Sequence, residues 1–387
     1  MTHSRLLHIL RSASPAHKIL QLPPRDLGLD TDREPFPFLA IVGQEEMKLA
    51  LSLALINPQV GGVLLIGARG TAKTTAVRAL PDLLPTVRHS LCPEGRGCTE
   101  EMVAREGIAA VCVTCATRFG YGEPLTKVER ARLVELPLNA RLEDVVGHIN
   151  ERVALEQQRL RLEPGILAQA DGNLLYIDEV NLLDSAVTDA ILDAAAQGAY
   201  TVRRGPSNFT YRARFLLIGS MNPEEGRLRP QLMDRFGLRA VARGLSPPRD
   251  RYQAYEQALW YRRDAEGLAA AYAEQTLALA AELEQARHLL PRVRVSAAAQ
   301  EMGLRLIESL GIDSNRAEMT LFEAARAYAA AAERDEVLME DVGAVALLAL
   351  RLRQSPLLEA FFRAQAEEDA ALAASAKAMT RGDQKVA

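Results

Sequence analysis

The sequence lacks the features that would send a chain into or across a membrane. No apolar run approaches the roughly 18 residues of a membrane span, and Met1 to Arg5 are not followed by a secretory core. We therefore expect a cytoplasmic protein without a transmembrane segment. An excess of basic charge is also missing, because the formal net charge is -4. Together with the lack of an appended DNA-binding motif, this balance argues against a nucleic-acid partner.

Cysteine is scarce, and all of it lies in one short window. The cysteines are Cys92, Cys98, Cys112 and Cys115, spaced C-x5-C-x13-C-x2-C. A cytoplasmic location argues against disulfides. Four thiolates can bind zinc tetrahedrally and the last pair has zinc-knuckle spacing, but the first pair is wider than usual, and His89 is a substitute ligand. A zinc site and reduced thiols in a variable loop both stay open.

The pattern along the chain indicates a division into domains. Residues 1–34 are polar and predict a short helix followed by a tether. In 35–245, strand-like apolar runs alternate with helical patterns, which indicates an open α/β sheet, and a cysteine-bearing insert occupies about 88–124. Residues 246–365 predict a helical linker and a helical lid domain, and 366–387 a flexible tail.

Two of these segments carry finer expectations. Leu142 to Leu162 and Tyr252 to Leu290 both have helical spacing. The C-terminal region predicts a helical bundle in which the following side chains lie on buried faces: Leu304, Ile307, Leu310, Leu347, Leu348, Leu350 and Leu352.

The most informative segment runs from Val63 to Thr75. A short apolar run precedes a glycine-containing loop, and Lys73 opens a helical pattern. In such a layout the loop N–H groups bind phosphates, the lysine reaches the β and γ oxygens and the next hydroxyl binds Mg2+. An ordinary strand-to-helix turn is the alternative. The candidate nucleotide-binding residues are Gly67, Gly70, Thr71, Ala72, Lys73, Thr74 and Thr75.

One position departs from the strict pattern G-x-x-x-x-G-K-[ST]. The chain has Ala72 where the pattern has its second glycine. A methyl group fits there if the residue keeps a right-handed backbone. The departure therefore weakens the match without removing it.

A second apolar run ends in two carboxylates. Asn173 to Ile177 predicts a buried strand of a parallel sheet, and Asp178 and Glu179 follow it. Ligands bind beyond the carboxyl ends of such strands. Asp178 is the candidate for holding Mg2+ through water, and Glu179 for polarising an attacking water. A helix N-cap acid is the alternative, but the two motifs in this order predict a Mg-nucleotide site.

Two further residues fit such a site. Asn222 follows the apolar strand Phe215 to Met221, where it could hydrogen-bond the lytic water or the γ-phosphate. Arg235 lies shortly downstream and is able to stabilise phosphoryl-transfer charge, in cis or from a neighbouring subunit. Considered alone, Asp234 and Arg235 are better explained by a surface ion pair.

In this order, the motifs resemble those of the AAA+ ATPases and, more narrowly, of the I subunits of magnesium chelatase. The resemblance spans about residues 36–360, and the stretch from Asn222 to Gly237 is specific to the chelatase branch. The other matching stretches are Phe38 to Glu45, Gly67 to Thr75, Glu163 to Ala168 and Tyr176 to Leu183. The resemblance implies an α/β P-loop NTPase domain with a parallel sheet, followed by an all-α lid.

The same resemblance implies a role for each matched residue. Lys73 and Thr74 would be the phosphate-loop pair, with ATP and Mg2+ as cofactors, and Asp178 and Glu179 the metal-binding and water-activating acids. Asn222 would be the first sensor and Arg235 the finger that acts on the neighbouring subunit's ATP. Arg316 would touch the γ-phosphate from the lid, although the family usually has Arg-Gly where this chain has Arg316-Ala317.

Three classes of function follow from these observations. The first is the ATPase motor of a metal chelatase that inserts Mg2+ into protoporphyrin IX in (bacterio)chlorophyll synthesis, or its cobalt-chelatase counterpart. It implies a homo-hexameric ring, a D-type subunit with an A domain and a porphyrin-binding H-type subunit. The second is a MoxR-like remodelling chaperone with a von Willebrand A-domain partner, which Ala72 mildly favours. The third, a nucleic-acid motor, is disfavoured by the charge.

Overall fold

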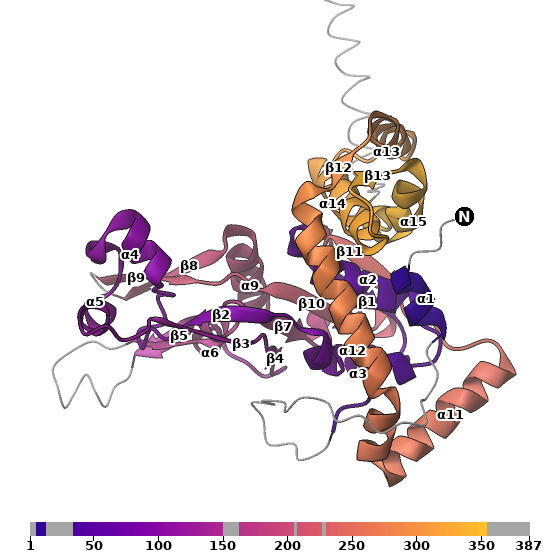
Figure 1. Cartoon of the computed structure of the whole chain (residues 1–387), viewed down its shortest axis with the longest axis horizontal. Coiled ribbons are helices and arrows are strands. Elements are labelled where there is room, and N and C mark those ends of the chain that lie inside the picture. The colour runs from indigo at the N-terminus through magenta and orange to yellow at the C-terminus, as the bar shows by residue number, and fades with distance from the viewer. Residues whose placement is uncertain (1–4, 13–33, 150–161, 205–206, 227–229, 354–387) are drawn as a thin grey trace, which may run out of the picture.

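The computed structural model describes residues 5–12, 34–149, 162–204, 207–226 and 230–353 (Figure 1). The predicted tail at 366–387 and most of the predicted N-terminal tether lie outside these residues. Among the helices of the described part, none combines the length and the apolar character needed to cross a bilayer.

A parallel sheet forms the centre of the α/β part. Its strands follow the order β11-β1-β10-β7-β4, and each neighbouring pair is parallel. Because β1, β7 and β10 are buried along their whole length, they have continuous apolar runs. They are also neighbours, so the segments after their carboxyl ends meet at one edge of the sheet. The bounds are β1 Val63–Ile66, β4 Leu133–Leu136, β7 Leu174–Ile177, β10 Leu216–Met221 and β11 Leu238–Val241.

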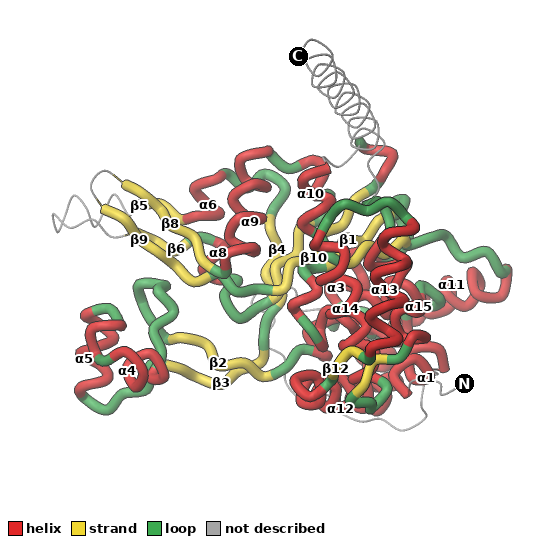
Figure 2. The backbone as a smooth tube through the Cα atoms, turned by 90° about the horizontal axis from the view of Figure 1, so that it is seen from above, coloured by secondary structure: helices red, strands yellow, loops and turns green. Residues whose placement is uncertain are grey.

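Two hydrophobic cores lie on opposite faces of this sheet, because successive strand residues point to opposite sides. Val63 and Leu65 join a core with α2 (Glu45–Ile56), α3 (Lys73–Arg78) and α12 (Ala265–Leu289). Leu64 and Ile66 join the other core, which also includes α6 (Leu142–Val146), α8 (Ile166–Gln169), α9 (Ser185–Gln197) and α10 (Pro230–Arg235). Helices thus cover both faces, as Figure 2 shows.

An arm of short hairpins projects from the sheet, away from the C-terminal helices (Figures 1 and 2). The antiparallel pairs are β2–β3, β5–β6 and β8–β9. The small helices α4 (Glu100–Glu106) and α5 (Val113–Gly120) lie at the end of β2–β3. The strand bounds are β2 Thr86–Ser90, β3 Thr126–Arg130, β5 Gly147–Ile149, β6 Leu162–Pro164, β8 Ala199–Arg204 and β9 Ser207–Arg212.

The helical spacing predicted from Leu142 to Leu162 is confirmed for α6 and wrong at residues 147–149 and 162, while the rest of that stretch lies outside the described part. Only α6 is helical there, and β5 and β6 pair as a hairpin on either side of residues 150–161, which lie outside the described part. Gly147 has φ +105, and an added Cβ would lie 2.4 Å from the Glu163 carbonyl oxygen. This glycine ends α6 and lets the two strands approach closely.

The C-terminal half is helical, with two corrections. The segment predicted as one run from Tyr252 to Leu290 is two helices, α11 (Pro248–Arg263) and α12, because Asp264 breaks the helix and its carboxylate caps the Gly267 N–H. A small parallel pair, β12 (Arg294–Val295) with β13 (Glu336–Val337), joins the lid helices. These are α13 Ala297–Ser309, α14 Asn315–Ala331 and α15 Met339–Leu350.

The predicted bundle core is only partly correct. Ile307, Leu348 and Leu350 are buried. Leu304, Leu347 and Leu352, in contrast, are exposed by 43%, 68% and 52%. Alanines make up most of the buried face of α14 instead, so leucine spacing alone does not identify the core-facing residues of the lid.

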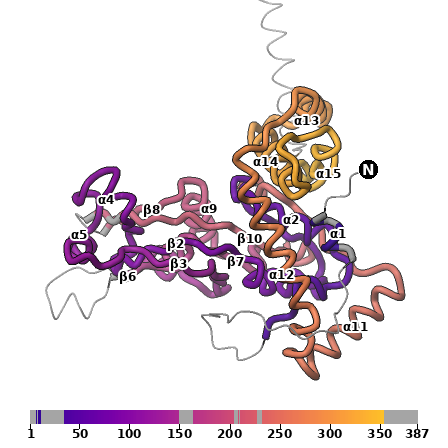
Figure 3. Tube along the Cα trace, in the orientation of Figure 1, coloured from indigo at the N-terminus to yellow at the C-terminus, as the bar shows by residue number. Residues whose placement is uncertain are grey.

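The N-terminal helix α1 (Arg5–Ser12) packs beside α2 and α12 (Figure 3), where Leu6 and Leu10 are buried. Single helical turns connect the larger elements: η1 Phe38–Ala40, η2 Pro58–Val60, η3 Leu80–Leu83, η4 Ile108–Ala110, η5 Val180–Leu182, η6 Pro223–Glu225 and η7 Leu290–Arg292.

Candidate nucleotide-binding site

The predicted phosphate loop connects β1 to α3. The Gly67 N–H donates to the Met221 carbonyl at 3.1 Å, which holds the loop against the end of β10. An added Cβ at Gly67 would lie 2.2 Å from the Ala242 carbonyl oxygen, so this position has no room for a side chain. Gly70 has φ +79, a left-handed conformation that favours glycine. The loop backbone therefore leaves no room for a side chain at Gly67 and favours glycine at position 70.

Ala72 does not meet the condition under which its methyl group was expected to fit. It has φ 65 and ψ 20, in the left-handed region rather than the right-handed one. The chain thus keeps the backbone of the strict glycine pattern while carrying a Cβ there. Such a conformation costs an L-residue about 1–2 kcal/mol. The loop geometry is therefore imposed by its surroundings and not by the preference of alanine.

The Lys73 ammonium lies inside the loop. It donates to the Gly67 carbonyl at 2.7 Å and to the Ala68 carbonyl at 2.9 Å. Burial lowers the pKa of Lys73, and the carboxylates of Asp178, Glu225 and Glu179 act in the opposite direction. A half-buried ammonium group among these backbone groups is well suited to bind phosphate oxygens.

Asp178 is held by hydroxyl groups from three elements. Thr74 Oγ1 on α3 donates to Asp178 Oδ2 at 3.2 Å, and the Tyr176 hydroxyl on β7 donates to Oδ1 at 2.9 Å. The Ser220 hydroxyl on β10 also donates to Oδ1. Burial acts to raise the pKa of Asp178, but these hydrogen bonds outweigh it, so the pKa lies below its usual value. The structure thus brings Thr74 and Asp178 together, as predicted for a Mg2+ site of hard oxygen ligands.

Glu179 adjoins Asp178 but has different partners. Its backbone is left-handed, with φ 50, and its N–H donates to Ser220 Oγ at 3.1 Å. Its carboxylate lies 3.6 Å from Nη2 of Arg69, a residue of the phosphate loop, and Arg69 also pairs with Glu225. The phosphate loop is therefore joined to the acids after β7 by the Arg69–Glu179 ion pair as well as by the Thr74–Asp178 hydrogen bond.

Asn222, at the end of β10, is buried at the same edge. Its side-chain oxygen accepts the Glu224 N–H at 3.2 Å and caps η6. Arg235 points elsewhere: its guanidinium donates to the Leu192 carbonyl at 3.4 Å and to Asp193 Oδ1 at 3.3 Å. Within the described residues, none of its hydrogen bonds goes to the phosphate loop of its own chain. Sequence order alone could not show this.

Arg316, on α14, contacts the residue that precedes Arg235. Its Nη1 lies 3.2 Å from Asp234 Oδ2, and Arg353 Nη1 lies 3.1 Å from the other oxygen of the same carboxylate. The predicted second sensor therefore meets the end of α10 through Asp234, and the sequence reasoning missed both Asp234 and Arg353 as its neighbours.

A cavity of about 1720 Å³ opens beside the loop. Gly70, Thr71, Ala72, Thr74 and Thr75 form part of its wall. Apolar side chains from before α2 and from α11 form another part, namely Phe36, Ile41, Val42 and Tyr261. The rings of Phe36 and Tyr261 meet edge to face, with their centroids 5.3 Å apart. A phosphate loop beside an apolar, aromatic wall fits the two halves of a nucleotide.

Comparison with known proteins decides the family. A family model described as "Magnesium chelatase, subunit ChlI" matches residues 144–232, and one described as "AAA lid domain" matches residues 305–375. A magnesium-chelatase subunit ChlI homolog of Methanocaldococcus jannaschii is 40% identical over 323 residues, covering 83% of this chain and 86% of the relative. The magnesium-chelatase 38 kDa subunit of Acidiphilium rubrum is 41% identical over 351 residues, covering 89% and 99%. This chain belongs to the magnesium-chelatase I-subunit family.

The fold of this family member is that of the AAA+ ATPases, a parallel sheet with helices followed by a helical lid, as the sequence predicted. A crystal structure from Cytophaga hutchinsonii shares it with a TM-score of 0.50 at 19% identity, covering 81% of this chain and 83% of that one. Members of the family are the AAA+ motor subunits of the chelatase, and AAA+ ATPases use ATP and Mg2+.

Two residues that position Asp178 were missed by the sequence reasoning, although a signal was present. Tyr176 precedes Asp178 by two positions and therefore points to the same side of the strand. Gly219 pairs with Ile177 in the sheet, so Ser220 follows in register beside Asp178. Strand alternation would have found Tyr176, but Ser220 needs the β10–β7 pairing.

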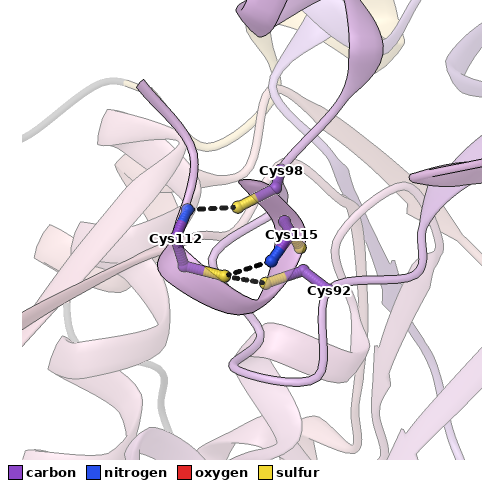
Figure 4. Close-up of side chains that lie close together, drawn as sticks. All are labelled: Cys92, Cys98, Cys112 and Cys115. Carbon is purple, nitrogen blue, oxygen red and sulfur yellow. Dashed lines mark hydrogen bonds between the residues drawn. The ribbon is translucent and has the colours of Figure 1, made fainter. Parts of the chain in front are cut away.

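The four cysteines of this chain come together at the end of the β2–β3 hairpin. Their sulfur atoms all lie within 4.8 Å of one another (Figure 4). His89, the predicted substitute ligand, is not in the cluster, and its ring lies beside Gly172 instead. All four cysteines are free of disulfides.

Proposed function

We propose that this chain is the ATP-hydrolysing motor subunit of a magnesium chelatase and that it drives insertion of Mg2+ into protoporphyrin IX together with partner subunits. The observation that carries the proposal is the meeting of Lys73, Thr74, Asp178 and Glu179 at one edge of the sheet. In a chain of this family, that arrangement combines a phosphate-binding cation, a hydroxyl–carboxylate pair and an adjacent acid.

Each residue has a part that follows from its contacts. Lys73 exchanges the loop carbonyls for phosphate oxygens as a point charge. Thr74 and Asp178 hold the Mg2+ of MgATP, which neutralises charge on the phosphates. The hydroxyls of Tyr176 and Ser220 keep Asp178 ionised and oriented, because they donate to the carboxylate.

Glu179 is the proposed water-activating acid. Its left-handed backbone turns its carboxylate away from the hydroxyl network of Asp178 and toward the loop residue Arg69. Two neighbouring carboxylates with such different partners suit different tasks, one in metal binding and the other in orienting water. Asn222, which is buried at the end of β10, is the proposed first sensor and would hydrogen-bond the lytic water or the γ-phosphate.

We further propose a homo-hexameric ring in which Arg235 acts on the ATP of the neighbouring subunit. Its side chain rests on α9 in its own chain, which supports action on a neighbour rather than in cis. The partners implied by the family are a D-type subunit with an A domain and an H-type subunit that binds the porphyrin.

The test is a reconstituted chelation assay with D-type and H-type partners, protoporphyrin IX, ATP and either Mg2+ or Co2+. Metalloporphyrin formation is followed by absorbance. We expect ATP-dependent Mg2+ insertion with the wild-type chain. Glu179→Gln should bind MgATP but not turn it over, because its geometry survives while the water-activating carboxylate is lost, and Lys73→Ala should lose ATP binding.

Glu224→Gln is the matched control, because this neighbouring carboxylate is exposed, and it should behave like the wild type. Equal hydrolysis by the wild type and Glu179→Gln would contradict the site assignment. Insertion of Co2+ but not Mg2+ would transfer the proposal to a cobalt chelatase. ATP-dependent release of a protein client without chelation would support the remodelling function instead.

A further inference from the structure

We propose that Cys92, Cys98, Cys112 and Cys115 form a tetrahedral zinc site that holds the end of the arm together. This inference concerns residues 91–125, which we term the cysteine module, and it does not depend on the proposed chelatase reaction. The module contains α4, η4 and α5 and lies at the tip of the β2–β3 hairpin (Figure 2).

The distances between the sulfur atoms fit a single metal ion. Four thiolates at about 2.3 Å from a tetrahedral zinc lie about 3.8 Å from one another. The Cys92 and Cys112 sulfurs are 3.7 Å apart, and all four lie within 4.8 Å. A contraction of at most about 1 Å would complete the tetrahedron. A disulfide needs about 2.05 Å between sulfurs, so the 3.7 Å pair is not one.

The backbone around the cluster is arranged as in a metal knuckle. The Cys112 N–H donates to Cys98 Sγ and the Cys115 N–H donates to Cys112 Sγ, both at 3.4 Å (Figure 4). Such hydrogen bonds from backbone N–H groups stabilise thiolate charge. The wide first pair is also explained, because Gly95 and Gly97, with φ +66 and +67, fold the loop so that Cys92 and Cys98 face the same point.

Burial and ligand chemistry indicate a structural zinc rather than a site for the Mg2+ substrate. Cys98, Cys112 and Cys115 are buried and Cys92 is partly buried, which leaves no open coordination position. Four sulfur ligands are soft and select zinc, whereas Mg2+ binds oxygen ligands.

The module has only a small hydrophobic core of its own. Its buried cluster consists of Cys98, Val111, Cys112, Cys115 and Leu125. The helices α4 and α5 are short, and isolated helices of this length are marginal in water. A small unit with such a core usually requires a disulfide or a metal ion.

The site fixes more than its own module. The Arg212 guanidinium on β9 donates to the Gly97 carbonyl at 3.1 Å, and Gly95 packs against Pro164 of β6 and Tyr211 of β9. The loop between the first two cysteines thus contacts the β5–β6 and β8–β9 hairpins. Zinc in this loop would hold all three hairpins of the arm in place, and its loss would loosen the arm.

The test begins with the full chain, purified without a metal-affinity tag and exchanged into metal-free buffer. Elemental analysis should give about one zinc per chain, and the four thiols should resist a thiol reagent until a strong chelator or denaturant is added. Replacement of zinc by Co2+ should produce thiolate-to-cobalt charge-transfer absorption. Limited proteolysis of the metal-stripped chain should produce cuts within residues 91–125 that the zinc-loaded chain does not show.

Cys112→Ser should lose zinc, whereas Val113→Ala, at an adjacent side chain that is 81% exposed, should keep it. If the serine variant does not fold, the zinc content and thiol protection of the wild-type chain still decide. A wild-type zinc content near zero with all four thiols freely titratable would overturn the proposal. So would undiminished zinc in a folded Cys112→Ser variant.

Discussion

Single residues in the phosphate loop show how strongly the surrounding structure controls local backbone. Ala72 has the left-handed conformation of the glycine that the motif usually has, although its Cβ disfavours that conformation. Gly70, with φ +79, adopts the same left-handed region without strain. The loop contacts Met221 at the end of β10 and Ala242, which follows β11. These contacts hold the loop geometry in place.

Ala72→Gly should therefore stabilise the protein. The relief of left-handed strain exceeds the entropy that glycine adds to the unfolded chain, so we expect the free energy of unfolding to rise by about 0.5–1 kcal/mol. The measurement is urea denaturation. Ala68→Gly, in the same loop but without a positive φ, should lower the same free energy. Equal shifts in the two variants would show that Ala72 is not strained.

At the scale of elements, the end of α10 connects two regions. Arg235 rests on α9, while the preceding residue, Asp234, accepts hydrogen bonds from Arg316 on α14 and from Arg353. One short helix therefore carries the proposed finger and a carboxylate that joins it to the lid. This arrangement favours a finger that serves a neighbouring site, since its own loop is not among its described partners.

Arg235→Ala should bind ATP and lose turnover by a factor on the order of 10³, because a transition-state cation is removed. Mixing it with Lys73→Ala should restore some ATP hydrolysis, because some interfaces then combine an intact Lys73 with an intact Arg235. Mixing Lys73→Ala with Glu179→Gln is the control and should restore none, since both residues act in the same chain. Absence of recovery in rings shown to contain both variants would argue for action in cis.

At the scale of the whole molecule, ion pairs join the lid to the α/β core. The Arg351 guanidinium, after α15, pairs with the Glu46 carboxylate on α2 and donates to the Arg239 carbonyl at 3.2 Å on β11. The buried Arg239 donates back to the Arg351 carbonyl at 2.5 Å, and burial lowers the pKa of Arg239 to about 10. The lid is thus anchored beside the strand that flanks the phosphate-loop strand.

Arg351→Ala should loosen this anchor. It leaves the half-buried Glu46 carboxylate with fewer partners, and we expect a loss of about 1–3 kcal/mol in the free energy of unfolding. The KM for ATP should rise, because the lid is held less firmly over the core. Arg305→Ala is the control, since its exposed pair with Glu301 is worth only about 0.2–0.5 kcal/mol. Similar unfolding curves and KM values for both variants would contradict the anchoring role.

The sequence by itself determined the features that depend on local pattern. Continuous apolar runs predicted the central strands, and the residues after them predicted where Lys73, Asp178 and Asn222 gather, because parallel neighbours end at one edge of a sheet. The motif order also indicated the AAA+ fold and the family. The domain boundaries near 34, 245 and 365, and the role of each site residue, stay predictions.

Only the tertiary structure decided what depends on contacts between distant segments. It placed Ser220 on Asp178, turned Arg235 toward α9, and left Leu304 and Leu347 exposed where helical spacing predicted burial. It also gathered four cysteines whose spacing had left open both a zinc site and a loop of free thiols. The physical reason is the same in each case: periodicity reports which face a side chain occupies, but strand pairing and hairpin packing determine what that face meets.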